Sequence, residues 1–122
     1  MSKEQKLITA VRAGDVTKVK LLLNAGANIH AYDDEALRRA AEYGHTKIVK
    51  LLLNAGANVH ALDDYALIWA ILNGRIEVIK LLLEAGADPY ARNCLVLRWA
   101  KEYRRIVKLL EPAMAKQGEP NE

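Results

Sequence analysis

The hydrophobic residues of this chain fall into short stripes with helical spacing. Leu37, Ala40 and Ala41 lie at positions i, i+3 and i+4, the spacing of one face of a helix. A second stripe follows over residues 48–53, which read IVKLLL. Gly44 separates the two stripes, at a position where glycine commonly ends a helix. The pattern predicts two short helices, each too short to be stable in isolation.

This two-helix pattern recurs along the chain. Residues 19–31, 49–61 and 79–91 read VKLLLNAGANIHA, VKLLLNAGANVHA and IKLLLEAGADPYA, so the period is 30 residues. A fourth, shorter copy follows near residue 92. Because no single pair of short helices can bury its own apolar faces, we expect the repeats to stack and to share one continuous core.

The repeated segment resembles the ankyrin repeats. Residues 40–59, AAEYGHTKIVKLLLNAGANV, carry the motif of that family, and the resemblance covers residues 3–111. It implies an all-α solenoid of four helix–turn–helix units joined by hairpin-like loops. The family's period is about 33 residues, so we place the missing residues at the hairpin tips and expect shortened loops. In this respect the chain is similar to short ankyrin repeats of large DNA viruses and some microbes.

We expect a single ankyrin-repeat domain, capped at both ends and followed by a flexible polar tail. Lys18 stands in the first unit where Ile48 and Val78 stand in the next two. In the last unit, Lys101 stands where the earlier units have Ala41 and Ile71. Polar residues are expected where no neighbouring repeat packs. The expected bounds are 1–115 for the domain, about 3–31, 32–61, 62–91 and 92–111 for the units, and 116–122 for the tail.

The resemblance implies that partners bind a concave face made by the first helix of each unit and the loop before it. Tyr32, Leu62 and Leu72 form the centre of this expected surface, because large apolar or amphipathic side chains there suit a binding hot spot. The alternative is that such residues are ordinarily solvated. The expected partner-binding residues are Tyr32, Glu42, Tyr43, Leu62, Leu72, Asn73, Arg92 and Tyr103.

The acidic residues in the loops have a simpler explanation than ligand binding. Asp33 or Asp34 precedes a predicted helix, where a carboxylate caps the first free amides. The row formed by Asp34, Asp64 and Cys94, with Asp33, Asp63 and Asn93 beside it, could instead meet a basic partner or a cation. We favour helix capping.

The histidines and tryptophans are likewise interpreted as structural. His30 and His60 are one repeat apart, farther than the bonds of one zinc ion reach, so we expect a loop role and no metal. Trp69 and Trp99 occupy the same position in successive units, and we expect both to pack in the core.

Composition and charge narrow the function further. The chain has 122 residues, of which 52% are hydrophobic and 27% charged, and its net charge of +3 does not require a nucleic acid. No pair of nucleophile and base and no phosphate-binding loop has a defensible spacing, so we expect neither an enzyme nor a cofactor. We therefore predict a non-catalytic protein–protein interaction module with a protein partner.

Two alternatives remain open at this point. Basic residues on the second helices could bind nucleic acid, although we do not expect it. The near-identity of residues 20–31 and 50–61 also suits a consensus scaffold without a natural partner. No apolar run approaches the roughly 20 residues that span a bilayer, and there is one cysteine, so we expect an intracellular, cytoplasmic monomer. The basic residues are Lys18, Lys20, Lys47, Lys50, Arg75 and Lys80, with Arg104, Arg105 and Lys108 near the end.

Overall fold

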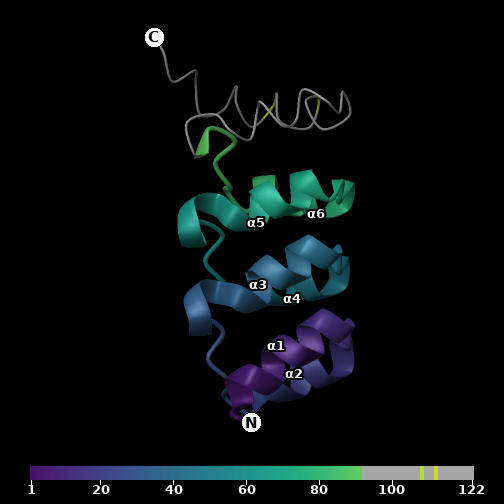
Figure 1. The fold of residues 1–122 in the computed structure, drawn as a ribbon, viewed down its shortest axis with the longest axis vertical. Helices are drawn as coiled ribbons and strands as arrows, with labels where there is room; N and C mark the ends of the chain where they lie inside the picture. Colours follow the sequence, from purple (N-terminus) through teal and green to yellow (C-terminus); the bar gives the residue numbers. More distant parts are fainter. Residues whose placement is uncertain (92–107, 109–111, 113–122) are drawn as a thin grey trace.

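Helices make up most of the protein and are arranged as stacked pairs (Figure 1). The structure is a computed structural model that describes residues 1–91 together with residues 108 and 112. Within these residues there is no β-strand. The fourth expected unit, the tail and the expected cap residue Lys101 lie outside the described residues. The helices are α1 (Lys3–Ala13), α2 (Val16–Asn24), α3 (Ala31–Tyr43), α4 (Thr46–Asn54), α5 (Ala61–Leu72) and α6 (Ile76–Glu84).

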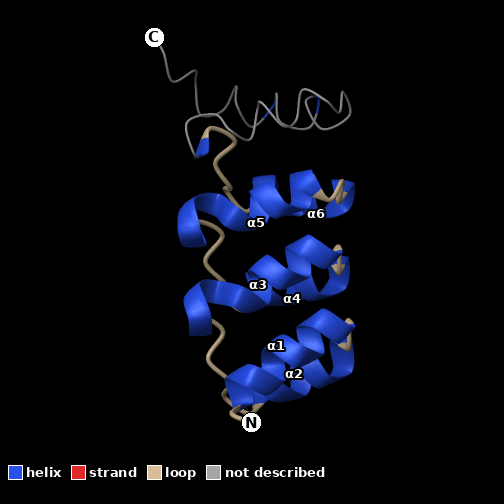
Figure 2. Cartoon of the chain, in the orientation of Figure 1, coloured by secondary structure: helices blue, strands red, loops and turns tan. Residues whose placement is uncertain are grey.

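The helix pairs stack as successive layers. Helices α1, α3 and α5 pack on one another in sequence, and α2, α4 and α6 form a second column beside them. Figure 2 shows the loops that join the repeats along one side of the stack and the turns within the repeats along the opposite side. The all-helical solenoid expected from the sequence is therefore confirmed for the first three units.

The core lies between the layers and uses the predicted stripes. Leu37, Ala40 and Ala41 are all buried. Ile48 and Val78 are buried as well, whereas Lys18 at the equivalent place in the first unit is exposed. Apolar side chains are therefore kept at this position where a preceding repeat packs against it, as expected from nearest-neighbour stacking.

The turns inside the first and second repeats are each covered by a side chain from the next repeat. Gly44 ends α3 with a left-handed φ of 73°, and a Cβ placed there would lie 2.7 Å from Cδ of Arg75. Arg75 Nε donates a hydrogen bond of 3.0 Å to the carbonyl oxygen of Glu42. His45 makes the equivalent contact one repeat earlier, with Nε2 3.2 Å from the carbonyl oxygen of Arg12. Glycine thus allows both the turn and the close approach of the neighbour.

The shortened loop is built as a left-handed turn. Tyr32, Asp33 and Asp34 have φ values of 57°, 54° and 55°, and the three residues at 62–64 repeat this geometry. The right-handed part of α3 follows this turn. The predicted N-caps are wrong, because neither aspartate makes a capping bond to α3 among the described residues. Asp34 is only 4% exposed, and its carboxylate instead reaches the loop that follows α4.

Candidate interaction surface

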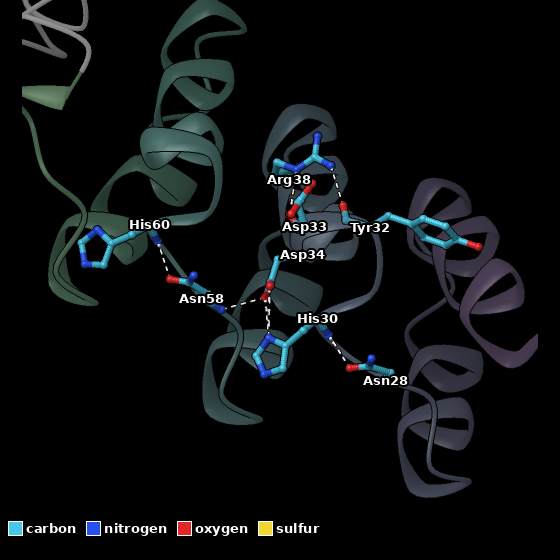
Figure 3. A network of polar contacts seen from close by, with 8 residues as sticks. All are labelled: Asn28, His30, Tyr32, Asp33, Asp34, Arg38, Asn58 and His60. Atoms are coloured by element: carbon cyan, nitrogen blue, oxygen red, sulfur yellow. Dashed lines mark hydrogen bonds and ion pairs between the residues drawn. The ribbon is translucent and has the colours of Figure 1, made fainter.

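A carboxylate on the first helix of each repeat binds a backbone amide in the loop that follows the second helix of the same repeat. Figure 3 shows this contact between Asp34 and Asn58. Each contact spans 24 residues of sequence, and we call the three acidic residues the linking carboxylates. The acceptor–donor pairs are Glu4 with the Asn28 amide at 2.8 Å, Asp34 with the Asn58 amide at 2.7 Å, and Asp64 with the Asp88 amide at 2.6 Å.

The loop histidines complete two of these contacts. Nδ1 of His30 lies 3.1 Å from both carboxylate oxygens of Asp34, and Nδ1 of His60 lies 2.9 and 3.1 Å from those of Asp64. The expected loop role of the histidines is therefore confirmed. Because Asp34 and Asp64 are buried and already hydrogen-bonded, the alternative that they meet a basic partner or a cation is wrong for these two residues, whereas Asp33 and Asp63 are exposed and it stays open for them. Cys94, the third member of that row, lies outside the described residues.

The surface of α5 carries a row of large apolar side chains. Tyr65, Trp69 and Leu72 lie at positions i, i+4 and i+7, which places them on one face of the helix. The ring centroids of Tyr65 and Trp69 are 5.2 Å apart, and Leu72 is 50% exposed. Trp69 packs against the core but is only partly buried, so the prediction of a core role describes one side of the ring. Trp99 lies outside the described residues.

The equivalent positions of α3 are charged rather than apolar. Arg39 donates from Nε to Glu35 at 3.1 Å and from Nη1 to Glu42 at 3.0 Å. The hydrogen bond to Glu42 is the main cause that raises the pKa of Arg39. The Arg39 guanidinium also lies 5.4 Å from the ring centroid of Trp69, within cation–π range. The contact between Arg39 and Trp69 therefore joins the charged row on α3 and the apolar row on α5 into one surface. We call this surface the first-helix stripe, and it consists of Glu35, Arg39, Glu42, Tyr65, Trp69 and Leu72.

Tyr32 and Leu62 are exposed in the left-handed turns, as predicted, but they line different hollows. Tyr32 is 55% exposed, and Figure 3 shows its ring pointing towards α1. It lines a hollow of about 410 Å³ together with Ile8 and Glu35. Leu62 is 43% exposed and lines a separate hollow of about 720 Å³ that also contains Asp63. The structure therefore does not place the two residues in one apolar patch.

The remaining predicted residues lie at helix ends or outside the described part of the chain. Tyr43 is exposed, and its ring centroid is 5.9 Å from that of His45. Asn73 is exposed, and its side-chain amide donates to the Trp69 carbonyl oxygen at 2.8 Å, closing the end of α5. Arg92 and Tyr103 lie outside the described residues.

Four residues of this surface did not emerge from the sequence as partner-binding residues. Glu35, Arg39, Tyr65 and Trp69 lie one or two helical turns before the predicted residues Glu42 and Leu72. Counting back from those two positions by three and seven residues would have found them, because that spacing keeps side chains on one face. The apolar pattern alone drew attention to the opposite, buried face.

The described residues offer no sign of a metal centre or a membrane span. Within residues 1–91, 108 and 112, no group of three or more histidine, cysteine or acidic side chains could hold a metal ion. Across the same residues, none of the helices combines the length and the apolar character needed to cross a bilayer.

Stacked helix pairs linked by the same contacts at a fixed interval define a helical repeat protein of the solenoid class. The family model for ankyrin repeats (3 copies) matches residues 7–93, which is more than half of the chain. The chain therefore belongs to the ankyrin repeat family. Ankyrin repeats generally serve as protein–protein interaction modules, and the family is typically non-catalytic. No curated protein matches the sequence.

Proposed function

We propose that this protein binds a protein partner through the first-helix stripe and the adjoining turn residues Tyr32 and Leu62, and that it acts by binding alone. The observation that carries the proposal is the continuous contact of Arg39, Trp69 and Tyr65 beside the exposed Leu72. Tryptophan, tyrosine and arginine are the residues most enriched at binding hot spots. The expectation of an intracellular monomer remains a prediction.

The stripe is held in place before any partner arrives. Arg39 is fixed by two carboxylates, and Trp69 packs on one side against the core. Side chains that are already ordered lose less conformational entropy on binding, and this smaller entropic cost increases the affinity. This supports a preformed binding surface over a set of solvated side chains.

The left-handed turns provide independent support. A bulky residue with positive φ is uncommon because its Cβ crowds the backbone. Tyr32 and Leu62 nevertheless hold the first position of each turn, although asparagine or glycine would fit it with less strain. Strained residues with exposed side chains gather at functional sites, so these two side chains fit a binding role better than a purely structural one.

The experiment is partner capture with matched leucine variants. The Leu62→Lys, Leu72→Lys double variant should reduce capture about tenfold or more, because charged side chains replace apolar anchors. Leu21→Lys is the control, since Leu21 is 64% exposed but lies on α2, away from the stripe. Captured proteins are quantified by mass spectrometry, and circular dichroism verifies the fold of each variant.

The control also sets the outcome that would refute the proposal. A partner that the double variant retains and Leu21→Lys loses would place the binding surface on the second helices. A partner whose capture is the same with wild-type protein and both variants would exclude the stripe and leave the binding role of this surface without support.

One observation favours a second candidate, the binding of nucleic acid. Lys20, Lys50 and Lys80 occupy equivalent positions of α2, α4 and α6, and all three are exposed. Phosphate contacts would make such binding fall steeply with salt concentration. A gel-shift titration with double-stranded DNA and with RNA at low salt tests this candidate, and the absence of a shifted band would eliminate it.

A further inference from the structure

The first-helix stripe lies on the acidic helices of the protein. We propose that the segment it takes from a protein partner is basic and apolar, with lysine or arginine side chains between hydrophobic anchors. This inference rests on the proposed function and adds the chemistry of the partner. It follows from the distribution of charge between the two columns of helices and from how each charge near the stripe is already used.

Charge is divided between the two columns in the middle of the stack, although α1 of the first column carries a net positive charge and α6 of the second a net negative one. Helix α5 contains Asp63 and Asp64 and no lysine or arginine. Helix α3 contains four acidic residues and two arginines. By contrast, α2 and α4 each contain two lysines and no acidic residue. A partner approaching the first helices of the second and third repeats therefore meets a negative potential, although the whole chain carries a net charge of +3.

The one cation of the stripe is not open to an acidic partner. Arg39 already donates to both Glu35 and Glu42, so a single positive charge faces two carboxylates. An incoming carboxylate would have to displace one of these bonds and would be repelled by the other. An incoming lysine or arginine would instead meet the surplus negative charge.

Asp63 offers the least compensated carboxylate beside an apolar anchor. It is exposed and lines the same hollow as Leu62. In the equivalent turn, Arg38 donates to the carbonyl oxygens of Tyr32 and Asp33 at 2.8 and 3.1 Å and places a positive charge there. The third repeat has the buried residue Ile68 at that position. Within the described residues, Asp63 has no salt bridge, so its charge can attract a cation of the partner.

The aromatic rings favour the same partner. The guanidinium of Arg39 already stacks near Trp69, and this contact shows that the local geometry suits a cation over the ring. Tyr65 and Trp69 are both half-buried, and their exposed parts give the hydrophobic anchors of the partner a surface to pack on beside the acidic residues. Basic and apolar groups of one segment can thus be satisfied side by side.

The test selects peptides from a phage-displayed library of random sequences on the wild-type protein. Clones that lose binding to the Leu62→Lys, Leu72→Lys double variant are sequenced, and one is synthesised for fluorescence anisotropy. We expect these clones to be enriched in lysine and arginine next to hydrophobic residues. Asp63→Asn should raise the dissociation constant of the selected peptide about threefold to tenfold, because one close charge pair is lost.

A matched control separates local contact from general attraction. Glu77 is an exposed acidic residue on α6, and Glu77→Gln removes the same unit of charge away from the stripe. It should change the dissociation constant less than about twofold, because exposed charges farther apart than the Debye length are screened. Equal effects of Asp63→Asn and Glu77→Gln would overturn the inference.

The remaining outcomes distinguish this inference from the proposed function. Clones that depend on the stripe but lack lysine and arginine would overturn the basic partner and keep the binding surface. Clones that bind the double variant as tightly as wild type would count against the surface itself. A library that yields no binders would overturn this inference alone, because partner capture also detects folded proteins. Self-association in sedimentation velocity, abolished by both Lys50→Glu and Asp63→Asn, would replace the peptide-like partner with a second copy of the chain.

Discussion

The second repeat (α3 and α4) and the third repeat (α5 and α6) have the same backbone and different surfaces. Their buried positions carry equivalent residues, such as Leu37 and Leu67, and their loops carry the same pair of histidine and aspartate. The stripe differs at every position, with two glutamates and Arg39 in one repeat and two aromatic rings and Leu72 in the other. Packing thus constrains the identity of the buried and loop residues. It does not constrain the stripe residues, whose identity can therefore differ between repeats and determine which partner binds.

The largest expected effect concerns what the two repeats share. Leu37→Ala and Leu67→Ala each remove a fully buried side chain between neighbouring layers. We expect each to lower the free energy of unfolding by about 2–5 kcal/mol, the range for such truncations. Urea unfolding followed by circular dichroism measures both values. Costs that differ by more than about 2 kcal/mol would contradict equivalent packing in the two repeats.

The linking carboxylates should give the next largest effect. Asp34→Asn and Asp64→Asn leave one acceptor oxygen where two donors, a histidine Nδ1 and a backbone amide, now converge. We expect each to lower the free energy of unfolding by about 1–3 kcal/mol, because a buried donor is left unpaired or a charge-assisted bond is lost.

Asp33→Asn is the matched control for these two variants. Asp33 has the same left-handed backbone as Asp34, which asparagine tolerates, but its side chain is exposed. Its free energy of unfolding should stay within about 0.5 kcal/mol of wild type. If Asp33→Asn and Asp34→Asn cost the same, backbone conformation rather than the contact with the loop after α4 would explain the effect.

The sequence predicted the core and the repeat because both depend on local periodicity. The spacing of Leu37, Ala40 and Ala41 identifies a helix face, and Gly44 marks its end. The link from Asp34 to the loop after α4 could not be predicted in this way, since an aspartate before a helix is explained equally well by a local cap. Only the packing of α3 and α4 into one folded repeat brings the Asn58 amide, 24 residues away, within 2.7 Å of the carboxylate.

The binding surface was predicted in part for a related reason. Exposed positions such as Leu72 stand out because their side chains are apolar where solvent is expected. Trp69 does not stand out, because a tryptophan near an apolar stripe is usually a core residue. Its ring also contacts Arg39 from the neighbouring repeat, and this contact between layers is not visible in either helix alone.

The smallest expected effect has the opposite sign and tests the left-handed turns. Leu62→Asn keeps the turn but replaces a bulky side chain at a φ of 52° with a residue that tolerates this region. We expect the free energy of unfolding to rise by about 0.5–1 kcal/mol, which is the usual size of such backbone effects. Thermal and urea unfolding measure the change. Asp63→Asn is the control and should leave stability unchanged, because aspartate and asparagine both tolerate this conformation.

The same variant links strain to function. If Leu62 is kept for a partner, Leu62→Asn should gain stability and weaken capture of the partner together, the trade-off expected of a residue selected for binding. Tyr32→Asn should behave in the same way, because its backbone and exposure are equivalent. A loss of stability greater than about 1 kcal/mol would show instead that these side chains stabilise the turn through contacts within the protein. The strain could then no longer support a binding role, and that role would rest on the first-helix stripe alone.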